Sequence, residues 1–131
     1  MIFLGSLSMF NKKKIKILSV FGTRPEAIKM APILKNLSGN SKFISKACLT
    51  SQHTDLLAQV TDFFKIDADY DLSIMQSNQT LESITINVIK KLTTVIDEFK
   101  PDMILVQGDT TSTLSGALCG YYNKIQVGHV E

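Results

Sequence analysis

The chain has 131 residues, of which 44% are hydrophobic and 20% are charged, and its formal net charge is +2. These values exclude a disordered or collagen-like chain and predict one ordinary globular domain. A lysine-rich stretch over residues 12–16 has no interleaved aromatic residue or arginine. We therefore interpret it as a solvated lead-in to the first strand and predict no nucleic-acid partner.

The chain begins with an apolar stretch over residues 1–10, and its positive charges follow this stretch instead of preceding it. That order is wrong for a signal peptide, and the stretch is too short to span a bilayer. We interpret it as a start-site extension ahead of Met9, with a membrane-surface anchor as the alternative. Cys48 and Cys119 lie among apolar residues, which predicts two buried free thiols in a reducing cytoplasm, and neither a disulfide nor a metal site.

The first half of the chain alternates apolar runs with helical spacings. We expect a strand over 15–21, a helix over 26–37, a short strand over 47–50, a helix from Thr54 or Asp55 to Phe64, and a weak strand over 70–75. Pro32 lies inside the first predicted helix and predicts a kink there or an irregular first turn. The apolar face predicted for the second helix consists of Leu56, Leu57, Val60, Phe63 and Phe64.

The second half of the chain continues the alternation. We expect a polar loop over 76–79, a long helix over about 80–99, a strand over 103–106, a helix over 113–122 and a strand over 126–130. The run over 103–106 is apolar at every position, which is typical of a parallel strand buried on both faces. The pattern predicts an α/β fold with a Rossmann-like parallel sheet, helices on both faces and the doubly wound strand order 3-2-1-4-5.

Polar groups follow three of the predicted strands at the point where each strand ends. Arg24 follows the first strand, Asp109 the fourth and Glu131 the fifth. In the predicted order these strands are neighbours, so the three side chains are expected to converge at the switch-point crevice. Such a site suits an anionic ligand and proton transfer, because Arg24 and the free N–H groups of a helix start favour a phosphate. Lys29, one turn further on, adds a second candidate cation.

Each of these residues also has a purely structural interpretation. Arg24 and Glu26 fit an exposed turn pair equally well, and Asp109 fits a helix N-cap as well as an acid/base group. His129 shares a strand face with Glu131, which suits coupled proton transfer, but a buried, hydrogen-bonded histidine is an equal alternative. No histidine or cysteine spacing typical of a metal site is present, so we predict no metal.

Six segments taken together resemble the non-hydrolysing UDP-N-acetylglucosamine 2-epimerases. They occur in the family's order and cover the chain from about Lys14 to Glu131, leaving residues 1–13 outside the resemblance. The segments are Phe21-Gly22-Thr23-Arg24-Pro25-Glu26 with its continuation to Pro32, Thr50-Ser51-Gln52-His53, Asp69-Tyr70-Asp71-Leu72 with Met75-Gln76, Phe99-Lys100-Pro101-Asp102, Gln107-Gly108-Asp109-Thr110-Thr111-Ser112 and Gly128-His129-Val130-Glu131.

The resemblance implies a fold of two Rossmann-like domains, the GT-B-like arrangement, with the sugar nucleotide between them. Residues 14–131 resemble the first part of the N-terminal domain only, so the C-terminal nucleotide-binding domain is expected to be absent from this chain. The implied reaction inverts C2 of the sugar in UDP-N-acetylglucosamine, giving UDP-N-acetylmannosamine, by elimination and re-addition of UDP. It requires no nicotinamide and no metal.

The resemblance also assigns residues. Asp109 and Glu131 match the family's catalytic carboxylates, and Arg24 and Lys29 match its substrate-contacting cations. Gln52 and His53 match part of an allosteric site for a second substrate molecule, although Thr54 and Asp55 stand where Arg and Gln are expected. A cytoplasmic, homodimeric full-length parent that supplies cell-surface polysaccharide synthesis is implied, with a UDP-sugar as ligand and no membrane partner.

Two other functions stay open from the sequence. One is a catalytically inactive half-domain that binds a nucleotide or a protein, because a cleft enzyme needs both of its walls. The other is an epimerase that acts on a modified UDP-sugar.

Overall fold

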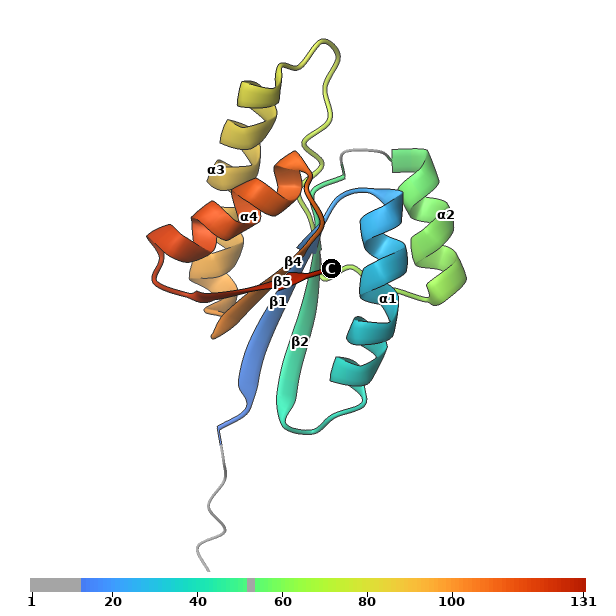
Figure 1. Cartoon of the computed structure of the whole chain (residues 1–131), viewed down its shortest axis with the longest axis vertical. Helices are drawn as coiled ribbons and strands as arrows, with labels where there is room; N and C mark the ends of the chain where they lie inside the picture. Colours follow the sequence, from blue (N-terminus) through green and yellow to red (C-terminus); the bar gives the residue numbers. More distant parts are fainter. Residues whose placement is uncertain (1–12, 52–53) are drawn as a thin grey trace, which may run out of the picture.

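The computed structural model describes residues 13–51 and 54–131 (Figure 1). The start-site extension and its alternative, a membrane anchor, concern residues outside these ranges. The elements are β1 (Ile15–Phe21), α1 (Arg24–Ser38), β2 (Phe43–Leu49), α2 (Thr54–Phe64), β3 (Tyr70–Asp71), α3 (Leu81–Phe99), β4 (Met103–Gln107), α4 (Thr111–Tyr122) and β5 (Gln126–Val130).

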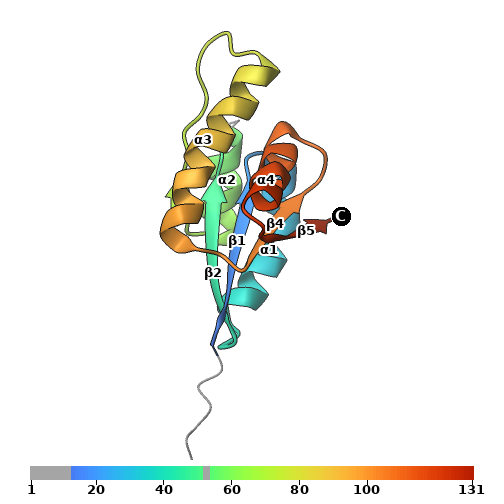
Figure 2. The same cartoon turned by 90° about the vertical axis from the view of Figure 1, so that its left-hand side faces the viewer.

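The five strands form one parallel sheet in the order β3-β2-β1-β4-β5, which confirms the predicted doubly wound topology. One core cluster joins α3 and α4 to the sheet, and a second joins α1 and α2 to its other face. Figure 2 shows α3 and α1 on opposite sides of the strands. The predicted fold class, with helices on both faces, is therefore correct.

Alternation along the strands explains why the sheet is buried on both faces. Leu18 and Val20 of β1 pack toward α3, while Phe21 packs toward α1. In β4, Ile104 and Val106 face the first cluster and Leu105 touches the second. Successive side chains of a strand point to opposite faces, so a run that is apolar throughout can fill both clusters.

The strands β2 and β3 differ most in length from the prediction. β2 begins at Phe43, four residues before the predicted start, because it pairs in parallel with β1 from Ile15 onward. β3 has only two residues, since Ser73 adopts a left-handed backbone with φ of 44°. α2 runs from Thr54 to Phe64, which agrees with the predicted helix.

The apolar face of α2 is narrower than predicted. Leu57 and Val60 are buried, but Phe63 is 79% exposed and Leu56 and Phe64 are also exposed. In α1, Pro32 lies inside an unbroken 15-residue helix. The proline is on the exposed side of α1, away from both core clusters.

Candidate active site

The carboxyl ends of β1, β4 and β5 lie side by side at one edge of the sheet. Val20 pairs with Val106, and Val106 pairs with His129, so the three strands end in register. The Gly108 N–H donates to the Val130 carbonyl at 3.3 Å, which extends the β4–β5 pairing beyond β4. Parallel strands bring the residues that follow them to a common edge, so Arg24, Asp109 and Glu131 come after three neighbouring strands, as the predicted strand order requires.

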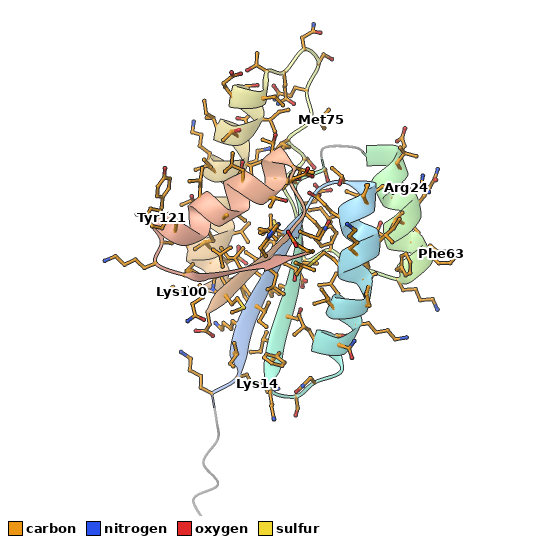
Figure 3. The ribbon with its side chains drawn as sticks, viewed as in Figure 1. Lys14, Arg24, Phe63, Met75, Lys100 and Tyr121 are labelled. Atoms are coloured by element: carbon orange, nitrogen blue, oxygen red, sulfur yellow. The ribbon has the colours of Figure 1, made fainter. Side chains whose placement is uncertain are left out.

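The turn between β1 and α1 is tightly packed. A Cβ on Gly22 would lie 1.7 Å from Thr50 Oγ1 at the end of β2, so only glycine fits there. Arg24 is the first residue of α1 and is exposed. Its side chain lines an open hollow of about 390 Å³ with Ile28 of α1 and residues of α2, and Figure 3 shows it at the end of α1 nearest α2. A direct meeting of Arg24 with the two carboxylates stays a prediction.

Glu26 is the residue that the sequence interpretation missed. It is only 2% exposed, so the alternative of an exposed Arg24–Glu26 turn pair is wrong. Its Oε2 accepts from the backbone N–H groups of Gly22 at 2.7 Å and Thr23 at 2.8 Å. These two N–H groups are therefore occupied by a protein carboxylate, and the expectation that they are free to hold a phosphate is incorrect.

The turn between β4 and α4 presents Asp109 to solvent. Gly108 has a φ of 80°, a conformation that favours glycine and reverses the chain directly before Asp109. Thr110, not Asp109, is the N-cap of α4, and its side chain accepts from the Thr113 N–H. The N-cap interpretation of Asp109 is therefore wrong. The Asp109 side chain is exposed and makes no hydrogen bond to the described residues, which leaves its carboxylate accessible to a ligand.

The remaining predicted residues lie at or near the same edge. Glu131 directly follows β5 and is exposed, and Lys29 is exposed one turn into α1. His129 is exposed instead of buried, and its Nε2 lies 2.7 Å from the Gly108 carbonyl oxygen. Gln52 and His53, the possible allosteric residues, lie outside the described residues.

The two thiols and the acidic side chains do not form a metal-binding group. Within residues 13–51 and 54–131, no cluster of three or more His, Cys, Asp or Glu side chains has the geometry to hold a metal ion. Cys48 and Cys119 are both buried, as predicted. Burial raises the pKa of the Cys48 thiol to about 12 and also raises the pKa of Cys119. Burial and a raised pKa both disfavour the thiolate, which is the nucleophilic form of cysteine.

Comparison with known proteins decides the family. The family model described as UDP-N-acetylglucosamine 2-epimerase matches residues 35–131. The chain belongs to the UDP-N-acetylglucosamine 2-epimerase family. It is 54% identical over 117 residues to the UDP-N-acetylglucosamine 2-epimerase of Neisseria meningitidis, covering 89% of this chain and 32% of that relative. The Bacillus subtilis enzyme of the same name is 49% identical over 119 residues.

Solved structures of this family have the same fold over the matched region. The Neisseria meningitidis enzyme bound to UDP-GlcNAc superposes with a TM-score of 0.86, and the chain covers 32% of it. The Methanocaldococcus jannaschii enzyme in complex with UDP-GlcNAc and UDP gives a TM-score of 0.83 at 32% identity. The chain thus spans about a third of the length of the relatives it matches. Among the described helices, none has the length and apolarity needed to cross a membrane.

Proposed function

We propose that residues 14–131 provide one wall of the active site of an epimerase that interconverts UDP-N-acetylglucosamine and UDP-N-acetylmannosamine. The observation that carries this proposal is the alignment of three strand ends in an epimerase-family chain. Arg24, Asp109 and Glu131 are all exposed and follow the neighbouring strands β1, β4 and β5. The Neisseria meningitidis relative, with the same fold over this region, was solved with UDP-GlcNAc bound.

The proposed reaction proceeds by elimination and re-addition. A base removes the C2 proton, the electron pair of the C2–H bond forms the C1–C2 double bond, and the C1–O bond breaks with its electrons passing to UDP. UDP then adds back to C1 of the 2-acetamidoglucal while an acid returns a proton to the opposite face of C2. Two acid/base groups are needed near C2, and Asp109 and Glu131 are the candidates.

The departing UDP carries the developing negative charge, so cations at the pyrophosphate stabilise the transition state. Arg24 and Lys29, at the start of α1, are the proposed cations. Because the Gly22 and Thr23 N–H groups are engaged by Glu26, this role falls to the side chains rather than to those two amides. The UDP-sugar is the proposed ligand of a cytoplasmic, homodimeric full-length protein whose product feeds cell-surface polysaccharide synthesis.

The test uses a chimera in which the 117 matched residues replace their counterparts in the Neisseria meningitidis relative. In deuterated water with UDP-N-acetylglucosamine, the chimera is expected to form the manno product and to incorporate deuterium at C2. Asp109→Asn and Glu131→Gln should each lower kcat by at least about a hundredfold, the scale of a lost acid/base group. Asp97→Asn removes an exposed carboxylate from α3 and serves as the matched control, with an unchanged rate.

Three results would contradict the proposal. Wild-type rates in both the Asp109 and Glu131 variants would remove these residues from the reaction. Binding of UDP without deuterium incorporation would indicate a nucleotide-binding half-domain instead. If the chimera does not react with UDP-N-acetylglucosamine but converts a modified UDP-sugar, the protein is an epimerase for that modified sugar.

A further inference from the structure

Glu26 is the only buried charged side chain among residues 13–51 and 54–131. Burying a carboxylate is unfavourable unless its oxygens accept enough hydrogen bonds. The two oxygens of Glu26 face different loops. Oε2 accepts from the Gly22 and Thr23 amides of the β1–α1 turn, and Oε1 accepts from the Thr110 hydroxyl at the start of α4.

In these contacts the Glu26 oxygens act only as acceptors. The Thr113 hydroxyl lies 3.4 Å from Oε1, but its single proton has a closer acceptor, the Gln107 carbonyl oxygen at 2.6 Å. Thr110 is therefore the principal hydroxyl donor to Oε1. Its oxygen also accepts from the Thr113 N–H, so one threonine both caps α4 and joins it to Glu26.

These contacts join the two loops that carry the proposed site. Arg24 lies two residues before Glu26, and Asp109 directly precedes Thr110. We propose that the Glu26 clasp, formed by Glu26 with Gly22, Thr23 and Thr110, sets the position of Arg24 relative to Asp109. Glu26 is on this view a positioning residue for the proposed epimerase reaction, and the inference rests on that proposed function.

The fold has a second connection near the clasp that does not involve Glu26. Thr50 Oγ1 and Ser112 Oγ are 2.7 Å apart and fully buried, and they join the end of β2 to the first turn of α4. The Thr113 hydroxyl also ties α4 to the end of β4. Variants that cut the clasp should therefore still fold, which makes its effect on the site measurable.

Two substitutions of Glu26 separate its reach from its charge. Glu26→Asp keeps the charge but is shorter by one carbon–carbon bond, about 1.5 Å, and cannot reach both loops. Glu26→Gln loses the charge but keeps the reach, because its carbonyl accepts from the two amides and its NH₂ donates to Thr110 Oγ1. In the chimera described above, Glu26→Asp should lower kcat about a hundredfold, the scale of a 1 Å misplacement. Glu26→Gln should keep more than a tenth of the rate.

Thr110 provides the partner test. Thr110→Val should lower kcat about tenfold, and Thr110→Ser, which restores the hydroxyl, should recover it. The matched control is Thr80→Val, because Thr80 caps α3 in the same way, accepting from the Ser83 N–H at 3.2 Å, but lies outside the clasp. Thr80→Val should lower the melting temperature as Thr110→Val does while leaving kcat unchanged.

Amide hydrogen exchange on the 131-residue chain tests the Glu26 clasp without measuring catalytic activity. Thr110→Val should speed amide hydrogen exchange at Gly22 and Thr23, because it removes the contact with Glu26, which lies 84 positions away in the sequence. Thr80→Val should leave the exchange of these two amides unchanged. Unchanged exchange in Thr110→Val, or equal kcat losses in Glu26→Asp and Glu26→Gln, would overturn the proposal. If the unsubstituted chimera has no activity, the proposed function is overturned, and the catalytic role of the clasp with it. Amide hydrogen exchange would still show whether the clasp joins the two loops.

Discussion

Gly22→Ala is the sharpest test of the packing beneath the site. The added Cβ would lie 1.7 Å from Thr50 Oγ1 and 2.9 Å from Ser112 Oγ. To reach ordinary contact, the Thr50 hydroxyl has to move by about 1.7 Å. This movement is opposed on two counts. The Thr50 side chain is fully buried, and the Thr50 backbone is held by a hydrogen bond from its N–H to the Phe21 carbonyl at 2.9 Å.

The expected cost combines two effects. Overpacking a well-filled core costs about 1–3 kcal/mol, and breaking the buried Thr50–Ser112 hydrogen bond adds about 1 kcal/mol. Gly22→Ala should therefore lower the free energy of unfolding by about 3 kcal/mol, which for a domain of this size is on the order of 10 °C in melting temperature. Urea unfolding of the 131-residue chain, followed by circular dichroism, measures this loss.

A double-mutant cycle identifies the cause. Thr50→Ala removes the atom that the new methyl group meets, so the double variant should lose at least about 1 kcal/mol less than the sum of the two single variants. Gly39→Ala is the matched control, because Gly39 has a φ of −81° and its added Cβ would meet nothing closer than 3.5 Å. Equal stability of the Gly22→Ala and Gly39→Ala variants, or strict additivity in the cycle, would refute the reasoning.

Three further predictions concern single side chains. Ser19 Oγ is buried with no hydrogen-bond partner among the described residues, so Ser19→Ala should raise the free energy of unfolding by about 1 kcal/mol in urea titrations. Folding raises the pKa of the Cys48 thiol from 9.0 to about 12. The contribution of this thiol to the free energy of unfolding is therefore complete below pH 9 and declines as the pH rises from 9 to 12. Stability should fall between pH 8 and pH 10 by about 1.4 kcal/mol more in the wild type than in Cys48→Ala. Asp109→Asn should change stability by about 0.5 kcal/mol or less, whereas Thr110→Ala should cost about 1 kcal/mol; equal losses in thermal melts would restore Asp109 as the cap.

The topology was predictable because apolar runs and helical spacings alternate along the whole chain. The early start of β2 was not predictable, because Ser45 and Lys46 interrupt the apolar pattern of this strand. The Lys46 ammonium lies 4.9 Å from the centroid of the Tyr70 ring and 5.0 Å from that of Phe99. These partners come from β3 and α3, so a local window of sequence does not reveal why a lysine belongs in the strand.

The sequence was sufficient to predict which strand ends carry the candidate site, but not the hydrogen bonds that join its loops. Residues that follow neighbouring strands had to share one edge, which placed Arg24, Asp109 and Glu131. Glu26 was missed because a glutamate two residues from an arginine resembles an exposed ion pair. The local signal was the spacing Thr23-x-x-Glu26, typical of a capping box, in which the glutamate reaches back to the N-cap amide. Its contact with Thr110 depends on the folded sheet and has no sequence signal.

The contact between Glu26 and Thr110 also bears on folding kinetics. Its partners are 84 positions apart, and β1, β4 and the crossovers between them have to be in place before the two side chains can meet. Closing so long a loop is entropically unfavourable until many other long-range contacts already hold its ends together. No early, locally ordered intermediate can therefore contain the assembled pair, which should appear only with the final cooperative step of folding.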